Sequence, residues 1–223
     1  MRQSRTPRAA LRAIFTICLW AVLFSSCIGV KADITLKADG SGRISLEYRV
    51  SRLLGDLGQL DGNQGQPTIP TGRADFERSL DRLPGLKLAS YSTKQDETDT
   101  ITRADIDFAS LEDLLPFLDA AGEGVSLSRA GGKTSLRLTL SSGAENIEPE
   151  LLSLVESVSQ GYKAAISLSG PRDTALALFD HGGKPLRGSN GIEWVQAGKK
   201  TSLAIPVSQL LALKEGLSLE FSW

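Results

Sequence analysis

The sequence predicts an α+β fold in which hairpins form an antiparallel β-sheet and helices pack on one face of it. Two observations support this prediction. Apolar and polar residues alternate in paired runs joined by turn residues, which is typical of β-hairpins. Between these runs, other segments space their apolar residues by three or four positions, as on one side of a helix. Because hairpin and helix follow each other three times, we expect helices to cover one face of an antiparallel sheet.

The first predicted hairpin consists of the alternating runs 34–38 and 44–50 around the turn Asp39-Gly40-Ser41-Gly42. The other predicted strands are 86–93, 100–108, 125–129, 136–140, 162–168, 175–179, 191–196, 201–205 and 217–223. Apolar residues at helical spacing predict helices near 76–83, 111–118, 147–158 and 206–211. Pro116 is expected to kink or shorten the second of these helices. The Gly-, Gln- and Pro-rich segment 55–72 predicts a loop.

These patterns divide the chain into three parts: a signal peptide over 1–26, an α+β domain over 27–160 and a β-rich part over 161–223. The last part is either a second lobe or a continuation of the same domain. The first part contains four arginines and no acidic residue before an apolar run at 13–24. A basic head, a short apolar middle and small residues at the end are the layout of a secretory signal peptide. The apolar run is shorter than the ~20 residues of a membrane-spanning helix.

Cys27 is the predicted lipidation site. Phe24-Ser25-Ser26-Cys27 resembles the lipobox of bacterial lipoproteins, which implies that the thiol receives a diacylglyceryl group after export. The family prefers Leu where this chain has Phe24. Cleavage elsewhere, an uncleaved anchor and a chance cysteine are the alternatives. Since Cys18 lies within the leader, the mature chain would keep one cysteine and form no internal disulfide.

The predicted location is therefore a bacterial cell membrane, reached by export and held through the lipid anchor, with the inner or outer face left open. The first strand was expected at Ile34, so residues 28–32 would form a tether of at most roughly 17 Å. Without the four leader arginines, 21 basic side chains face 26 acidic ones, a formal net charge of −5. This charge argues against nucleic acid as a partner and against electrostatic attachment to anionic lipids.

Residues for catalysis are scarce in this sequence, and we expect no enzyme activity, no catalytic residues and no cofactor. His181 is the single histidine, and its neighbours are residues typical of a turn. The sequence also contains no Gly-x-Ser-x-Gly elbow that would present a nucleophilic serine. Clustered His and Cys ligands for a metal are missing. Gly132-Lys133-Thr134 imitates the end of a phosphate-binding loop, but Leu127 replaces the required glycine and a strand follows. A catalytic pair of carboxylates is the alternative that the sequence leaves open, because some two of 26 acidic side chains can always lie close together in space.

Three acidic residues lie between the two strands of the second predicted hairpin. They are compatible with a metal site, but the polar sequence favours a hairpin turn that is exposed to solvent. These residues are Asp96, Glu97 and Asp99.

The alternation also resembles the LppM-type bacterial lipoprotein domain. The residues that carry this resemblance are 34–50, 85–108 and 108–115, behind the lipobox. It implies an α+β envelope protein without catalytic residues, and an apolar groove for lipids or glycolipids. No ligand-binding residue can be carried over. Two hypotheses follow: a membrane-anchored module that binds a lipid or glycolipid, or a structural lipoprotein that contacts envelope proteins.

Overall fold

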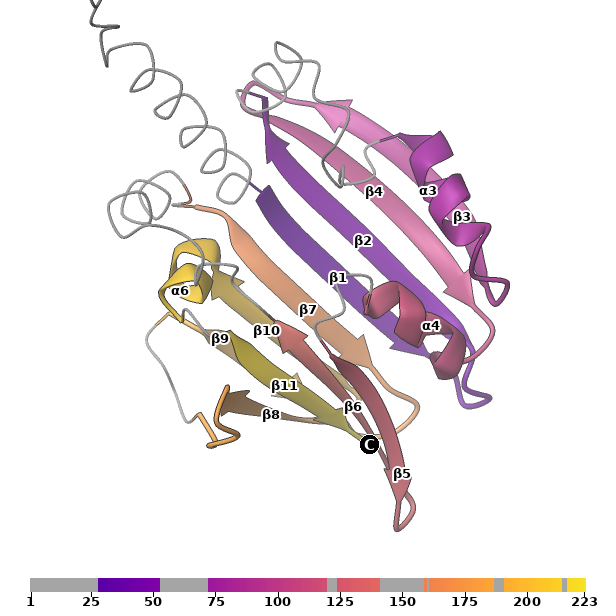
Figure 1. Cartoon of the computed structure of the whole chain (residues 1–223), viewed down its shortest axis with the longest axis vertical. Helices are drawn as coiled ribbons and strands as arrows, with labels where there is room; N and C mark the ends of the chain where they lie inside the picture. Colours follow the sequence, from indigo (N-terminus) through magenta and orange to yellow (C-terminus); the bar gives the residue numbers. More distant parts are fainter. Residues whose placement is uncertain are drawn as a thin grey trace, which may run out of the picture.

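The computed structural model describes residues 28–52, 72–119, 124–140, 159, 161–186, 191–213 and 216–223. Within these ranges it contains eleven strands and three short helices, and the strands form two β-sheets (Figure 1). The predicted α+β class is therefore wrong, because the fold is mostly β. The helices have eight, eight and six residues, too few to cover the face of a seven-stranded sheet. The predicted signal peptide, Cys27, the loop 55–71 and the helix 147–158 lie outside the described residues.

The larger sheet has seven strands and the smaller has four. The order in the larger sheet is β3 (Leu86–Gln95), β4 (Asp99–Phe108), β2 (Gly42–Ser51), β1 (Ile28–Leu36), β7 (Lys163–Ser169), β10 (Lys200–Pro206) and β9 (Glu193–Ala197). The order in the smaller sheet is β5 (Val125–Ala130), β6 (Lys133–Leu140), β11 (Leu217–Ser222) and β8 (Ala175–Asp180). All neighbours are antiparallel except β1 and β7, which are parallel.

The predicted hairpins β1–β2, β3–β4 and β5–β6 are confirmed. The start of the first strand was predicted too late. β1 begins at Ile28, which lies opposite Val50, so residues 28–32 are part of the sheet and not a tether. The sequence did not indicate this earlier start, because the charged Lys31 and Asp33 interrupt the apolar pattern. Both lie on the solvated side of a strand whose other side is apolar.

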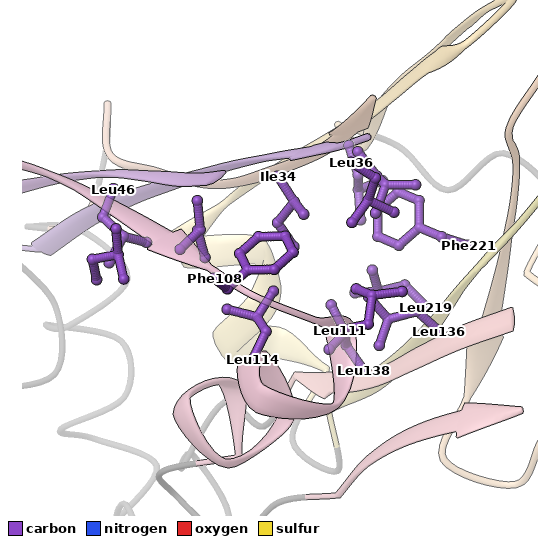
Figure 2. Close-up of a cluster of buried hydrophobic side chains, with 14 of the residues drawn as sticks. Ile34, Leu36, Leu46, Phe108, Leu111, Leu114, Leu136, Leu138, Leu219 and Phe221 are labelled. Atoms are coloured by element: carbon purple, nitrogen blue, oxygen red, sulfur yellow. The ribbon is translucent and has the colours of Figure 1, made fainter. Parts of the chain in front are cut away.

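Alternation along the strands gives each sheet one apolar face, and these faces share one core. Figure 2 shows Ile34, Leu36 and Phe108 of the larger sheet beside Phe221 and Leu219 of the smaller one. All five side chains are buried. Burial of apolar area at ~25 cal/mol per Å² is the main force that holds the two sheets together.

A close approach at Gly42 helps to fix the first hairpin. A Cβ atom built there would lie 2.1 Å from the carbonyl oxygen of Thr35 and 2.4 Å from the Phe108 ring. Within the turn, the backbone N–H and the hydroxyl of Ser41 both donate to Asp39 Oδ1, at 2.9 and 2.8 Å. Glycine is therefore required at position 42 for packing, whereas the turn itself is held by Asp39.

The three helices are short and pack against individual strands: α3 (Arg73–Leu80) contacts β3, α4 (Leu111–Leu118) contacts β4 and β5, and α6 (Val207–Ala212) contacts β10. In α3, the buried Phe76 ring has its centroid 6.3 Å from that of Tyr48 and 5.8 Å from that of Tyr91. In α4, which ends two residues after Pro116, the Asp113 N–H donates to the N-cap hydroxyl of Ser110 at 3.2 Å. The helix α6 follows β10 directly. None of the described helices is long and apolar enough to cross a membrane.

Both sheets combine strands from 27–160 with strands from 161–223. In the larger sheet β1 lies between β2 and β7, and in the smaller one β11 lies between β6 and β8. The core accordingly contains buried residues from both parts, such as Ile34 and Leu168.

Candidate functional site

One end of the larger sheet contains the beginnings of β1 and β7 and the end of β2. At this end Val30 lies beside Ala164 of β7, and Gly29 lies opposite Arg49 of β2. Cys27, the predicted lipidation site, directly precedes Ile28 in the sequence. A lipid bound to Cys27 would therefore be joined to this end of the sheet without an intervening linker.

A cavity of about 400 Å³ lies at the same end, and we name it the Tyr162 pocket. It is lined by Gly29, Val30, Lys31, Glu47, Arg49, Asp99, Gly161, Tyr162, Lys163 and Ala165. A Cβ atom at Gly29 would lie 3.4 Å from Tyr162 Cδ1, so the tyrosine ring packs over the glycine. The missing side chain thus leaves room for Tyr162 beside the floor of the pocket.

Tyr162 also joins two distant parts of the chain across the pocket. Its hydroxyl donates to Asp99 Oδ1 at 2.8 Å, and the Asp99 residue is buried at the start of β4. The predicted exposure to solvent is thus wrong for Asp99. Asp96 does belong to the turn, since its Oδ1 accepts from the N–H groups of Asp99 and Thr98 at 2.7 and 2.9 Å. These two hydrogen bonds hold the pKa of the Asp96 carboxyl below its usual value.

Glu47 forms the charged wall on the β2 side. Its two carboxylate oxygens accept from Arg49 Nε at 3.1 Å and from Arg103 Nε at 2.7 Å. Burial acts to raise the pKa of Glu47, but the hydrogen bonds from Arg103 and Arg49 outweigh it and leave the pKa below its usual value. Glu47 is therefore ionised at neutral pH and fixes the position of both guanidinium groups.

On the other side, two lysines of the pocket are also paired. Lys31 Nζ lies 2.8 Å from Asp33 Oδ2, and the Ser167 hydroxyl donates to the other oxygen of Asp33. Burial raises the pKa of Asp33, yet the hydrogen bonds from Lys31 and Ser167 bring it below its usual value. Lys163 Nζ lies 2.6 Å from Glu193 Oε1. Each of these cations keeps donors free for a further acceptor, because an ammonium group has three.

A second hollow of about 260 Å³ continues from the Tyr162 pocket along the same face of the sheet. The two share Lys31 and Ala165, and the second extends to β10 and β9. Small side chains form its floor, among them Ala165, Ser167, Ser202 and Ala204. Together the two hollows form a shallow trough on the outer face of the sheet. Small residues line its floor and charged residues its walls, so it is suited to hydrogen bonds with hydroxyl or phosphate groups.

Of the described residues that the sequence singled out, Asp99 lines the pocket and the others lie elsewhere. His181 is exposed in the turn after β8, and Lys133 begins β6 after a glycine turn. Among the described residues, no group of three or more His, Cys, Asp or Glu side chains is placed to hold a metal ion. Sequence reasoning missed the Tyr162–Asp99 contact because it joins positions 63 residues apart. No local pattern indicates such a pair.

The comparisons with known proteins give a weak structural relation. No protein-family model matches the sequence, and no curated protein matches it. Among solved structures, the chain is similar to the folded domain of LppM from Mycobacterium tuberculosis, determined by NMR, at 15% identity and a TM-score of 0.39. The similarity covers 82% of this chain and 91% of that domain. Membership of the LppM-type family stays a prediction from the sequence pattern.

Proposed function

We propose that the mature protein is a non-enzymatic lipoprotein of a bacterial cell envelope, anchored through acylated Cys27. The supporting sequence features are the basic head, the short apolar run and the lipobox-like end of the leader. The observation that carries the proposal is that β1 begins at Ile28, the residue after Cys27. An exported domain that starts in a central strand at this position would lie directly on the bilayer surface. Two or three acyl chains, at ~0.8 kcal/mol per buried methylene, would retain it there.

Within this proposal, the Tyr162 pocket binds the polar head of a membrane lipid or glycolipid. The pocket lies at the end of the sheet next to Cys27, where headgroups would surround it. Six of its ten lining residues are charged or carry a hydroxyl: Lys31, Glu47, Arg49, Asp99, Tyr162 and Lys163. The fixed guanidinium of Arg49 and the lysines suit phosphate oxygens, and the carboxylates suit sugar hydroxyls.

The anchor is tested by replacing each of the two cysteines. We expect Cys27→Ser to abolish incorporation of a radiolabelled fatty acid and to leave the leader uncleaved or release the protein from membranes. Cys18→Ala is the matched control, because Cys18 lies in the segment that is removed. Equal labelling and equal membrane retention of both variants would refute the anchor.

Lipid binding is tested by filling the floor of the pocket. Ala165→Phe places a ring between the two hollows, and we expect about a tenfold loss of phospholipid and glycolipid that co-purifies with the protein, measured by mass spectrometry. Ala177→Phe is the control, because Ala177 is also a half-buried strand alanine but lies in β8 of the smaller sheet. Unchanged lipid content in Ala165→Phe would exclude the pocket as the binding site.

A further inference from the structure

The two sheets have four edges, and three of them carry features that prevent the addition of another strand. At β8, the N–H of Leu186 donates to the carbonyl of Leu178 at 2.9 Å, and Pro185 bridges to Phe179. This short segment covers the edge of β8. At β5, α4 lies against the strand, and Glu112 of the helix pairs with Arg129. Such coverings are common protections of sheet edges.

The β3 edge is protected by its own sequence. Its pairing with β4 is irregular between Leu88 and Ser90, which indicates a β-bulge. Two exposed lysines, Lys87 and Lys94, stand near its ends. A bulge twists an edge away from flat pairing, and lysine makes the approach of a second strand costly.

The β9 edge lacks these features. Its register with β10 runs without a shift over all five residues, it contains neither proline nor lysine, and every one of its residues is exposed. Among the described residues, no backbone hydrogen bond reaches its free side. Trp194 and Val195 are 40% and 58% exposed, and they are the exposed large hydrophobic residues of the described chain. An uncovered edge strand presents a row of unpaired N–H and C=O groups, and this row is a template for pairing with another strand.

We propose that β9 receives an extended strand of a partner protein by β-strand addition. Trp194 lies opposite Leu203 and therefore projects from the face that carries the core, whereas Val195 lies opposite Ser202 and projects from the other face. Cross-strand neighbours share a face, so the partner offers apolar side chains at successive positions, one beside each of these residues. Lys199 is exposed in the turn that follows β9, and an acidic residue of the partner lies there.

A second copy of this chain does not fit the edge when both copies are anchored. Antiparallel pairing of β9 with itself requires a twofold axis perpendicular to the sheet, which reverses the strand direction. The two β1 starts, and with them the two Cys27 residues, would then point in opposite directions. This step rests on the proposed anchor, and it leaves a strand of another protein as the occupant.

The test uses the mature protein, purified from the cell fraction that contains it, and a short synthetic peptide with two adjacent valines at its centre, threonines on either side of them and a glutamate at each end. Amide hydrogen exchange is followed by mass spectrometry. We expect saturating peptide to slow exchange in 193–197 on the order of threefold or more. The same peptide with N-methylated central amides should give no protection, because it lacks the donors that pair with a strand.

Two variants complete the test. Val195→Lys introduces the protection that β9 lacks and should abolish the effect, whereas Ser128→Lys, at an exposed position of β5, should preserve it. No protection, equal protection by the N-methylated peptide, or concentration-dependent protection without peptide (a second copy) would each overturn the proposal. Fatty-acid labelling of the same preparation reports on the anchor separately, so that its failure is distinguishable from failure at β9.

Discussion

The two faces of the seven-stranded sheet come from the same strands but differ in what they do. In β2, Ile44 and Leu46 are buried in the core, whereas Arg43 and Glu47 on the opposite face are paired with charges of neighbouring strands. The core face holds the two sheets together, and the outer face forms the trough. Because alternate residues serve the two purposes, changes on one face should leave the other intact. Substitutions on each face test this separation.

The largest effect is expected in the core. Phe221 of β11 is fully buried where the two sheets meet, so Phe221→Ala should lower the free energy of unfolding by about 3–5 kcal/mol. Chemical denaturation followed by circular dichroism measures this change. The neighbouring Glu220→Ala lies on the other face of β11 and should cost below about 1 kcal/mol. Similar losses in both variants would contradict a shared core between the sheets.

A smaller loss is expected at Gly42, where β2 has no room for a side chain beside Thr35 of β1. Gly42→Ala brings a methyl group within 2.1 Å of a backbone oxygen, and the hairpin must shift to accept it. We expect a loss of about 1–3 kcal/mol in the same denaturation experiment. Gly182→Ala is the control, since its Cβ would lie 3.4 Å from Asp180 Oδ1, an ordinary contact. If both variants are equally stable, the packing at Gly42 is wrong.

Low pH should reduce the free energy of unfolding, because it protonates carboxylates on the outer face of the larger sheet. Asp105 accepts from the hydroxyls of Ser45 and Ser90 at 2.6 and 2.7 Å, and these two bonds hold its pKa below the usual value. A carboxyl whose pKa is lower in the folded state contributes stability above its unfolded pKa of ~3.9 and loses it as pH falls through the folded pKa. The free energy of unfolding should therefore decrease below about pH 4. Asp105→Asn should flatten this slope, and an increase in stability on acidification would contradict the arrangement.

The smallest effect is expected for one ion pair of the outer face. Glu47 and Arg103 lie 2.7 Å apart, but half of the Arg103 side chain is in contact with solvent. A double-mutant cycle with Glu47→Gln and Arg103→Gln should give a coupling energy below about 1 kcal/mol that decreases with added salt. A coupling as large as the loss in Phe221→Ala would mean that the outer face, too, holds the fold together.

Sequence reasoning located elements well where the pattern is local. Alternation about Asp39-Gly40 identified the first hairpin, and helical spacing located the helix that buries Phe76 and Leu80, although this helix begins at Arg73 and ends at Leu80. It failed where distant segments combine. Neither the parallel pairing of β1 with β7 nor the antiparallel pairing of β11 with β6 follows from a local signal. The second sheet was therefore missed, and helices were predicted to cover the first sheet instead.

The candidate site was even less predictable than the fold. Lys31 was placed in a tether because a charge interrupts the apolar run, although it is a strand residue of the trough. Tyr162 was predicted to begin a strand, but β7 begins at Lys163, and the contact of Tyr162 with Asp99 depends on the arrangement of β1, β2, β4 and β7. A pocket built from ends of strands is visible only when the sheet is assembled.

The proposed anchor and the position of the Tyr162 pocket beside it both depend on Cys27, the residue that precedes β1. Mass spectrometry of the N-terminal peptide of the membrane-extracted protein measures it directly. We predict a mature chain that begins at Cys27 and carries the mass of a diacylglyceryl group on that residue. A chain that retains residues 1–26, or one that begins elsewhere with an unmodified cysteine, would contradict the anchor and the membrane-facing position of the Tyr162 pocket.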